Sequence, residues 1–302
     1  KTPIGPWVRQ GSLHPFGVSA ECPHAIRGPD GAYLVFHTGC GNLSNPNSIR
    51  KPERHDCTNA TTPAHLMGPI HGQPSPSWQQ RRRVPTCGHT AERTSVFVSA
   101  SPAGPWEQHL LELRGHDTNG VTWPPTNSTS RLGRRNGNPT AYIFENGTTV
   151  LLFRSEYATD ADCVAVGGIL TTTYRPGCTL VGLARAHTSW RGPYDVLGGP
   201  IMPFQQEDPH LYRDAAGHFH VLMHGMDPYG SKLGVGRHAF SIDGLHPWHY
   251  FNNTAIGAGD IETAFGNVVD LVGGGSIALL RRERPELVLG GADGRTPVAL
   301  IT

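Results

Sequence analysis

Long apolar runs and an excess of charge are both missing from this sequence. No apolar run reaches the roughly 18 residues that a membrane-spanning helix needs. Charged residues make up 16% of the chain and the formal net charge is +1, which gives no reason to expect nucleic acid or an acidic membrane surface as a partner. These absences predict a chain without a membrane span and without a nucleic-acid function.

The cysteines lack the Cys-x-x-Cys spacing that is typical of zinc ribbons and thioredoxin-like sites. Their even number instead predicts up to three disulfides, as in many secreted proteins. Cys163 and Cys178 form the easiest local pair, and the other connectivities stay open. The six cysteines are Cys22, Cys40, Cys57, Cys87, Cys163 and Cys178.

Five sequons for N-glycosylation occur along the chain, more than chance alone would give. They lie at Asn42, Asn59, Asn127, Asn146 and Asn252. The sequence begins with Lys1 rather than Met, so we expect that a signal peptide has been removed. Together these features predict a secreted or cell-surface glycoprotein, and they leave open its assembly with other extracellular chains.

What the sequence does contain is a repeated phrase of two short strands joined by a glycine turn. Each copy opens on a proline, and the four copies are PHAIRGPDGAYLVFHTG from Pro23, PTAYIFENGTTVLLFRS from Pro139, PHLYRDAAGHFHVLMHG from Pro209 and PELVLGGADGRTPVALI from Pro285. The turn glycines are Gly31, Gly147, Gly217 and Gly294. The second strands are nearly continuous apolar runs, which indicates that both of their faces are buried.

A second phrase follows the first and ends in an aromatic residue, at Trp106, Tyr194 and Trp248. We expect these aromatics to serve outer-strand packing rather than sugar stacking. A further copy, residues 5–7, stands at the N-terminus without its preceding strand. If this segment completes the sheet that the last copy begins, both chain ends close one ring and no sheet edge is left exposed.

The pattern predicts an all-β fold with one β-propeller domain over residues 1–302, closed by the N-terminal segment. We expect five blades, the fifth being a degenerate copy within 249–284; four blades remain the other option. Residues 41–88 interrupt the repeat, and we expect them to form a disulfide-containing insertion loop. The competing interpretation is a β-sandwich with similar hairpins, but sandwiches rarely reuse one phrase at matched offsets.

The phrases together resemble those of the five-bladed propeller glycosidases, in particular glycoside hydrolase family 43 and its uncharacterised eukaryotic relatives. The likeness covers most of residues 20–302 in pattern. It implies a propeller fold and activity on glycans, and it is more specific for fold than for activity.

In a propeller, the residues just before each proline should meet at one mouth of the central channel. These pairs are Glu21-Cys22, Gly137-Asn138, Glu207-Asp208 and Glu283-Arg284. Three of the four pairs hold a carboxylate. Glycoside hydrolysis needs such a set, with one carboxylic acid to protonate the leaving oxygen and one carboxylate to activate water or attack carbon.

The resemblance implies a carboxylate base, a pKa-tuning aspartate and a glutamic acid on three different blades. Asp208 best matches the family's Asp-Pro phrase and is the first choice for a site residue. Glu21 stands where the family usually has Asp, which leaves the base in doubt. Glu207 and Glu283 are the candidate acids, although arginines flank Glu283 and would depress its pKa. Each of these carboxylates could instead serve only as a structural cap or ion-pair partner.

Substrate contacts are expected from other residues near the same mouth, namely His24, Asn138, His210 and Arg284. Arg284 could hold the carboxylate of an acidic sugar, because a guanidinium grips carboxylates in a planar fork. A second interpretation, which we favour here, is that it neutralises carboxylates within the channel.

Histidine is frequent, at 17 residues, and several histidines lie in the third copy. Because no HExxH-like phrase accompanies them, no catalytic metal is assigned and no cofactor is required. The resemblance implies a structural calcium ion in the central channel.

These observations predict a secreted, glycoside hydrolase-like protein that hydrolyses or binds a glycan or polysaccharide at the channel mouth. The alternative is a non-catalytic glycan-binding or structural extracellular propeller. A metal-dependent lyase or hydrolase that uses the histidine cluster is a third option, and it would lose activity to chelators.

Overall fold

The computed structural model describes residues 21–39, 94–114, 136–157, 159–169, 177–226, 236–250, 263–279, 282–292 and 294–302, without the side chains of Glu21 and Asn136. Over these residues the chain is all-β, with one short helix, α1 (Asp160–Ala165). The all-β prediction is therefore confirmed. Residues 1–20, including the N-terminal copy of the aromatic phrase, and the insertion 41–88 lie outside the described residues.

Two sheets have four antiparallel strands that follow one another in chain order. The first sheet is made of β1 (Glu21–Arg27), β2 (Tyr33–Thr38), β3 (Thr94–Ser99) and β4 (Glu107–Leu110). The other is made of β10 (Gln206–Arg213), β11 (Phe219–Gly225), β12 (Gly236–Ser241) and β13 (His249–Tyr250). Each sheet is a simple meander that begins with the proline phrase of its own copy.

A five-stranded sheet lies between these two in chain order. Four of its strands are β6 (Asn136–Ile143), β7 (Thr149–Tyr157), β8 (Cys178–Ala186) and β9 (Tyr194–Val196). The fifth, β5 (Leu113–Arg114), pairs in parallel with β9 and comes from the segment after the first sheet. This short pairing joins the first two copies of the repeat.

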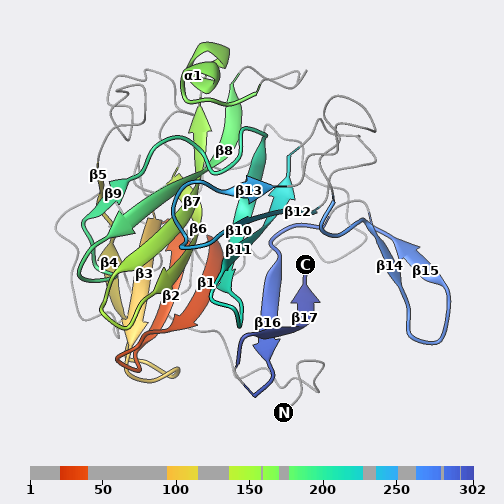
Figure 1. Cartoon of the computed structure of the whole chain (residues 1–302). Helices are drawn as coiled ribbons and strands as arrows, with labels where there is room; N and C mark the ends of the chain where they lie inside the picture. The colour runs from red at the N-terminus through yellow and green to blue at the C-terminus, as the bar shows by residue number, and fades with distance from the viewer. Residues whose placement is uncertain are drawn as a thin grey trace, which may run out of the picture.

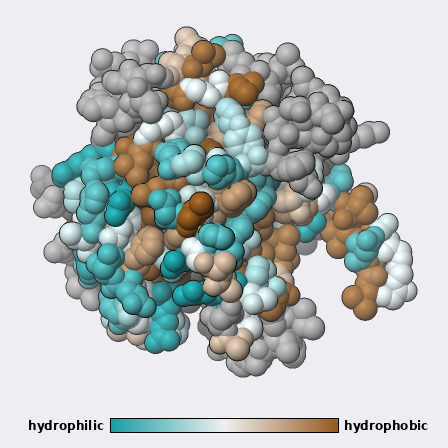
Figure 2. Space-filling view, viewed as in Figure 1, coloured by the Kyte–Doolittle hydropathy of each residue, from teal (hydrophilic) through white to brown (hydrophobic). Residues whose placement is uncertain are grey.

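The fourth copy forms only the hairpin of β16 (Glu286–Gly290) and β17 (Thr296–Ile301) within the described chain. Another hairpin, β14 (Val268–Asp270) with β15 (Ser276–Ala278), falls in the interval where a degenerate copy was expected. Figure 1 shows it extending away from the other sheets, and Figure 2 shows apolar residues on it. Val272 at its tip is fully exposed, so this hairpin has no sheet packed on it among the described residues.

The first strands of the copies lie next to one another, as Figure 1 shows for β1, β6 and β10. A hydrogen bond joins two of them directly, because the Leu211 amide of β10 donates to Thr140 Oγ1 of β6 at 3.0 Å. The Thr38 hydroxyl, at the end of β2, also contacts Asn138 of β6. The repeat therefore sets the spatial order of the sheets as well as their local form.

The turn glycines behave as the phrase predicts. Gly31, Gly147, Gly217 and Gly294 all have positive φ, at 84°, 85°, 94° and 64°. Only glycine adopts this backbone conformation without steric strain, and it lets the two strands of each copy fold back on each other.

The middle sheet is covered on both faces, which explains the continuous apolar run in β7. Val150 and Leu152 pack with Phe219 and Met223 of the sheet β10–β13. The alternate residues of β7 point the other way, because successive side chains of a strand face opposite sides. They pack against the sheet β1–β4 in a second cluster, whose members include Leu34, Phe36, Val96, Leu151 and Phe153.

The aromatic phrase supplies further core side chains, as expected. Trp106, Tyr194 and Trp248 are all buried. The Tyr194 hydroxyl also donates to the Trp190 carbonyl, so the buried phenol is satisfied. This confirms their packing role.

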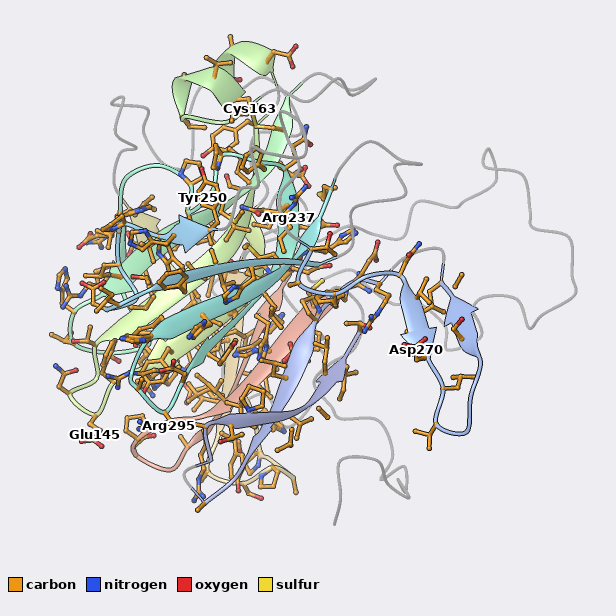
Figure 3. All side chains as sticks on the ribbon, turned by 45° about the vertical axis from the view of Figure 1, so that its right-hand side comes forward. Glu145, Cys163, Arg237, Tyr250, Asp270 and Arg295 are labelled. Atoms are coloured by element: carbon orange, nitrogen blue, oxygen red, sulfur yellow. A yellow bond between two sulfur atoms is a disulfide. The ribbon has the colours of Figure 1, made fainter. Side chains whose placement is uncertain are left out.

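Cys163 and Cys178 form a disulfide, as predicted, with a Cα–Cα distance of 5.8 Å. It ties α1, which contains Cys163, to the start of β8. Figure 3 shows Cys163 at the end of the molecule far from β16 and β17. Thr159 caps the helix through a hydrogen bond from the Asp162 amide. Cys40, Cys57 and Cys87 lie outside the described residues.

Asn146 is exposed in the turn between β6 and β7, where an attached glycan would meet solvent. Its modification stays a prediction. Asn42, Asn59, Asn127 and Asn252 lie outside the described residues. Among the helical residues that are described, none form a helix long and apolar enough to cross a membrane.

Candidate active site

The residue before each phrase proline has an unusual backbone conformation. It lies in the left-handed region, with φ between 48° and 53°, at Cys22, Asn138, Asp208 and Arg284. In the first three copies a register shift interrupts the strand pairing at the same place. A non-glycine residue held there costs roughly 1 kcal/mol or more, and such strain often accompanies functional sites. In these three copies the bulge turns the side chain before the proline out of the regular pleat.

All four of these residues line one pocket of about 230 Å³, together with the prolines that follow them. His24 and Glu286 complete the lining. The predicted convergence of the residues before the prolines is therefore present in the structure. The prolines give the pocket apolar walls, and the polar groups project between them.

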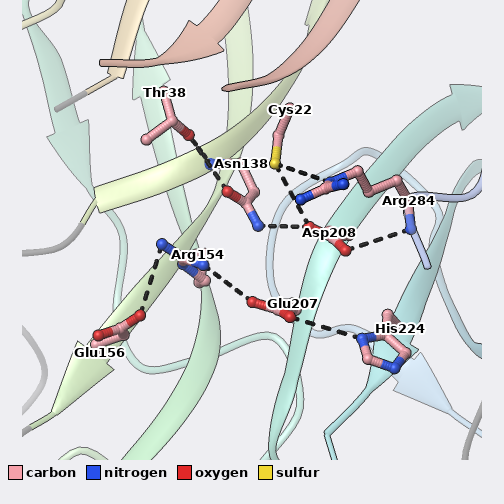
Figure 4. A network of polar contacts seen from close by, with 9 residues as sticks. All are labelled: Cys22, Thr38, Asn138, Arg154, Glu156, Glu207, Asp208, His224 and Arg284. Carbon is pink, nitrogen blue, oxygen red and sulfur yellow. Dashed lines mark hydrogen bonds and ion pairs between the residues drawn. The ribbon is translucent and has the colours of Figure 1, made fainter. Parts of the chain in front are cut away.

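Asp208 is the central group of the pocket, and it is only 6% exposed (Figure 4). Asn138 Nδ2 donates to its Oδ1, and the Arg284 backbone amide donates to its Oδ2 at 3.3 Å. The Cys22 thiol contacts Oδ1 at 3.9 Å. Burial, reinforced by the nearby negative charge of Glu207, raises the pKa of Asp208 to about 6. This carboxyl can therefore hold a proton in mildly acidic solution.

Asn138 is held in place by the neighbouring sheet. Its backbone amide donates to Thr38 Oγ1, and the Thr38 hydroxyl donates to Asn138 Oδ1 at 3.3 Å. Because the side-chain oxygen faces Thr38, the amide nitrogen is left to face Asp208. The contact between β2 and β6 thus orients the Asn138 side-chain amide so that it donates to Asp208.

Cys22 is a free cysteine, so its predicted disulfide is wrong. Its position before Pro23 directs the sulfur into the pocket, where Arg284 Nε donates to Sγ at 3.2 Å. Burial, with the charge of Asp208, raises the pKa of this thiol to about 11. Cys22 is thus a neutral thiol at physiological pH, and a neutral thiol is a poor nucleophile.

Glu207 does not line the pocket, although it precedes Asp208 directly. Arg154 Nη1 donates to its Oε2 at 3.0 Å, and His224 Nδ1 lies 3.6 Å from its Oε1. Arg154 is also 3.5 Å from Glu156. Burial alone would raise the pKa of Glu207, but the His224 and Arg154 contacts outweigh it and lower that pKa. A carboxylate held ionised in this way is poorly suited to donate a proton.

Glu286, which directly follows Pro285, is the pocket residue that the sequence reasoning missed. His210 Nδ1 lies 2.8 Å from its Oε2, and His24 Nδ1 lies 3.5 Å from the same atom. Burial would raise the pKa of Glu286, but these two histidines overcome that effect and lower it to about 2. A second carboxyl therefore faces the pocket and stays ionised.

The repeat itself holds a signal for Glu286. The residues directly after the four phrase prolines are His24, Thr140, His210 and Glu286. Three of these four residues meet around one carboxylate oxygen. His24 and His210 were predicted from this position, and continuing the alignment into the fourth copy would have added Glu286.

The two predicted histidines differ in their roles. His24 lines the pocket, and both histidines are buried. The Leu287 amide donates to His210 Nε2 at 3.2 Å. In the neutral ring this leaves the proton on Nδ1, where it faces Glu286. His210 is thus a positioning group for that carboxylate.

The other predicted carboxylates are not among the residues that line the pocket. Glu283 is half-buried, and its charge acts on Asp208 and Arg284 from outside the lining. The side chain of Glu21 lies outside the described ones. Asp208, Asn138, His24 and Arg284 are the predicted site residues that the pocket brings together.

The donor atoms near the pocket do not match calcium, which takes six to eight oxygen ligands. One compact group combines two imidazoles with a carboxylate, His24, His210 and Glu286. The other group is Glu207, Asp208 and His224, and hydrogen bonds already engage its carboxylates. A channel calcium ion stays a prediction that these groups do not favour.

No protein-family model matches the sequence, and no curated protein matches it. Solved structures of glycoside hydrolases do match, at low identity. A thermostable family-43 glycoside hydrolase matches with a TM-score of 0.37 and 10% identity, covering 77% of this chain and 54% of its own. A family 117 glycoside hydrolase from the marine bacterium Zobellia galactanivorans matches with a TM-score of 0.40 and 12% identity, covering 82% of this chain and 59% of its own. An endo-arabinase from Bacteroides thetaiotaomicron matches with a TM-score of 0.36 and 14% identity, covering 84% of this chain and 67% of its own.

The predicted resemblance to family 43 glycoside hydrolases is thus confirmed as a structural similarity. The chain spans somewhat more than half the length of the first two of these structures, 54% and 59%. At these identities and TM-scores the similarity assigns no residue role and no substrate to this chain.

Proposed function

We propose that this protein is a secreted glycoside hydrolase-like propeller in which Asp208 and Glu286 act as an acid–base pair on a glycan. One observation carries the proposal. Two carboxyl groups line the same pocket, and their surroundings move their pKa values apart, to about 6 for Asp208 and about 2 for Glu286. Opposite shifts of this kind are how carboxyl pairs divide acid and base work.

The two groups would have complementary roles. Protonated Asp208 would give its proton to the leaving glycosidic oxygen, while ionised Glu286 would activate water or attack the sugar carbon. His210 and His24 would keep Glu286 ionised. Asn138 would hold Asp208 in place through its side-chain amide.

The propeller arrangement is also part of the proposal. The sheets follow the repeat in order, and their first strands are neighbours, as blades around one channel would be. The edge strand β17 exposes Val298 and Ile301. We expect residues 1–20 to complete that sheet and so close a single five-bladed domain.

Secretion agrees with the confirmed disulfide, because such bonds persist mainly in oxidising compartments. The exposed sequon at Asn146 fits the same route. A sugar partner, N-glycosylation and extracellular location are therefore proposed together.

The test is a hydrolysis screen on mixed plant and algal polysaccharides, read as the release of reducing ends. We expect Asp208→Asn and Glu286→Gln each to lower kcat/KM about 10²- to 10⁴-fold. Activity should be highest between about pH 2 and pH 6, and it should fall above pH 6 as Asp208 loses its proton. Glu145→Gln is the control, because that side chain is exposed in the turn between β6 and β7 and lies outside the pocket lining. Equal activity in the wild type and both pocket variants would contradict the proposal.

A non-catalytic glycan-binding role is the second candidate. Both oxygens of Asp208 already accept hydrogen bonds from Asn138 and Arg284, which favours a structural task for that carboxyl. If a glycan binds but no hydrolysis product forms at any pH between 3 and 8, the result supports the non-catalytic role.

A further inference from the structure

We propose that Arg284 forms a carboxylate-binding subsite at the pocket mouth, so that the glycan recognised there contains an acidic sugar such as a uronate. The sugar class rests on the proposed function. The binding itself does not require hydrolysis, so the two ideas can fail separately.

The contacts of Arg284 leave the ends of its side chain available. Its backbone amide donates to Asp208 Oδ2, and its Nε donates to Cys22 Sγ. Among the described residues, no hydrogen bond or ion pair engages its two terminal nitrogens. The side chain is exposed and lines the pocket, and Figure 4 shows it extending toward Cys22.

Those two contacts also orient the guanidinium plane. Sulfur is a weak acceptor, so the Nε contact fixes the side chain without neutralising its charge. The planar pair of terminal nitrogens then matches the two oxygens of a carboxylate. A neutral sugar could use the same donors, but it would not gain the charge-assisted bond.

Arg284 carries the permanent positive charge of the pocket lining, and Cys22 and Asn138 are uncharged. The lining also holds the ionised Glu286, whose carboxylate is engaged by His210 and His24. The favourable place for an anion is therefore at Arg284 and not beside Glu286. Asp208 and Glu283 are the acidic groups that act on the charge of Arg284, and burial raises the pKa of Asp208 to about 6. Below that pH, the charge of Arg284 is unopposed by Asp208, and the apolar proline walls strengthen its field.

Arg282, two residues earlier, differs from Arg284 because structural contacts engage its guanidinium. Its Nε donates to Thr302 Oγ1 and its Nη1 donates to the Gly266 carbonyl, both at 2.8 Å. Its guanidinium lies over the Phe265 ring, 4.9 Å from the centroid. Arg282 is not part of the pocket lining, so Arg282→Gln removes the same charge without touching the proposed subsite.

The test is calorimetric titration of the full chain at pH 5 with di- and trigalacturonate, and with galactose oligomers of equal length as the neutral probe. The acidic oligomer should bind at least tenfold more tightly than the neutral one, because only its carboxylate forms the charge-assisted pair with Arg284. Arg284→Gln should abolish this preference, Arg284→Lys should keep part of it, and Arg282→Gln should leave it unchanged. Circular dichroism of each variant shows whether it is folded.

Raising the pH from 5 to 7 should weaken acidic binding, because ionised Asp208 then competes for Arg284. Asp208→Asn should remove that pH dependence. The inference is overturned by equal binding of both oligomers, by a preference that survives Arg284→Gln, or by binding of a sulfated oligomer only. If acidic oligomers bind as expected but no glycan is ever hydrolysed, the inference stands and the proposed activity falls.

Discussion

The third and fourth copies of the repeat begin with the same phrase but lie in very different surroundings. The third copy opens a four-stranded sheet whose inner face is packed in the core. The fourth forms a two-stranded sheet with exposed apolar residues. Even so, Asp208 and Arg284 reach the same pocket through the same left-handed turn before a proline.

This difference separates what builds the pocket from what stabilises the fold. The phrase places a side chain at the mouth whether or not its sheet is complete. The stabilising burial comes from the complete sheets. The two copies also supply carboxyls of opposite character, a buried Asp208 and a half-exposed, histidine-bound Glu286.

The pH dependence of stability gives the largest expected contrast between the copies. The pKa of Asp208 is raised from 3.8 to about 6, so its contribution to stability is present below pH 3.8 and is lost as the pH rises through 6. Relative to Asp208→Asn, the wild type should lose roughly 3 kcal/mol of unfolding free energy between pH 3.5 and pH 7, at about 1.4 kcal/mol per pKa unit. Urea denaturation over that range measures it.

Glu286 should show the opposite sign in the same experiment. Its pKa is lowered from 4.5 to about 2, so its contribution is present above pH 4.5 and is lost as the pH falls toward 2. Relative to Glu286→Gln, the wild type should therefore be less stable in acid than at neutral pH. If the difference in unfolding free energy between wild type and variant changes in the same direction with pH for both variants, the predicted opposite signs are wrong.

One matched substitution compares the packing of the two copies. Val221 and Val298 occupy the same place, four residues after the turn glycine, and they are 0% and 52% exposed. Val221→Ala should lower the unfolding free energy by about 2 kcal/mol through lost burial and a cavity. Val298→Ala should change it by less than about 0.5 kcal/mol. Equal losses in urea denaturation would show that the fourth copy is packed as tightly as the third.

The hydrogen bonds between sheets give the smallest contrast. The Leu211 amide donates to Thr140, and the Leu287 amide donates to His210 at the same place in the next copy. Thr140→Val should cost about 1 kcal/mol, because it leaves a buried donor unpaired. Native-state hydrogen exchange should show the Leu211 amide opening only with global unfolding and the Leu287 amide opening at a lower free energy. The same opening energy for both amides would argue against two classes of sheet.

Much of this architecture could be predicted from the sequence because it is local. Turn glycines, apolar second strands and the proline positions are fixed by backbone sterics, and repetition extends them to the meeting of Cys22, Asn138, Asp208 and Arg284. Glu207 was placed at the mouth beside Asp208, but neighbouring residues of a strand point to opposite sides. Its Arg154 and His224 partners come from other strands, so the sequence did not reveal them.

The charge states of the pocket could not be predicted for the same reason. The pKa of Asp208 depends on its burial, which only the assembled sheets create. The pKa of Glu286 depends on His24 and His210, two residues from other copies of the repeat. The free thiol of Cys22 likewise follows from where its turn aims the sulfur, which cysteine counting does not give.

The most direct test of the acid–base pair is a carboxyl carbon-13 NMR titration of the full chain, with signals assigned through Asp208→Asn and Glu286→Gln. The account predicts that Asp208 titrates near pH 6 and Glu286 near pH 2. Two titrations that both fall near pH 4 would contradict it, because the pocket would then hold two ordinary carboxylates and no acid–base pair.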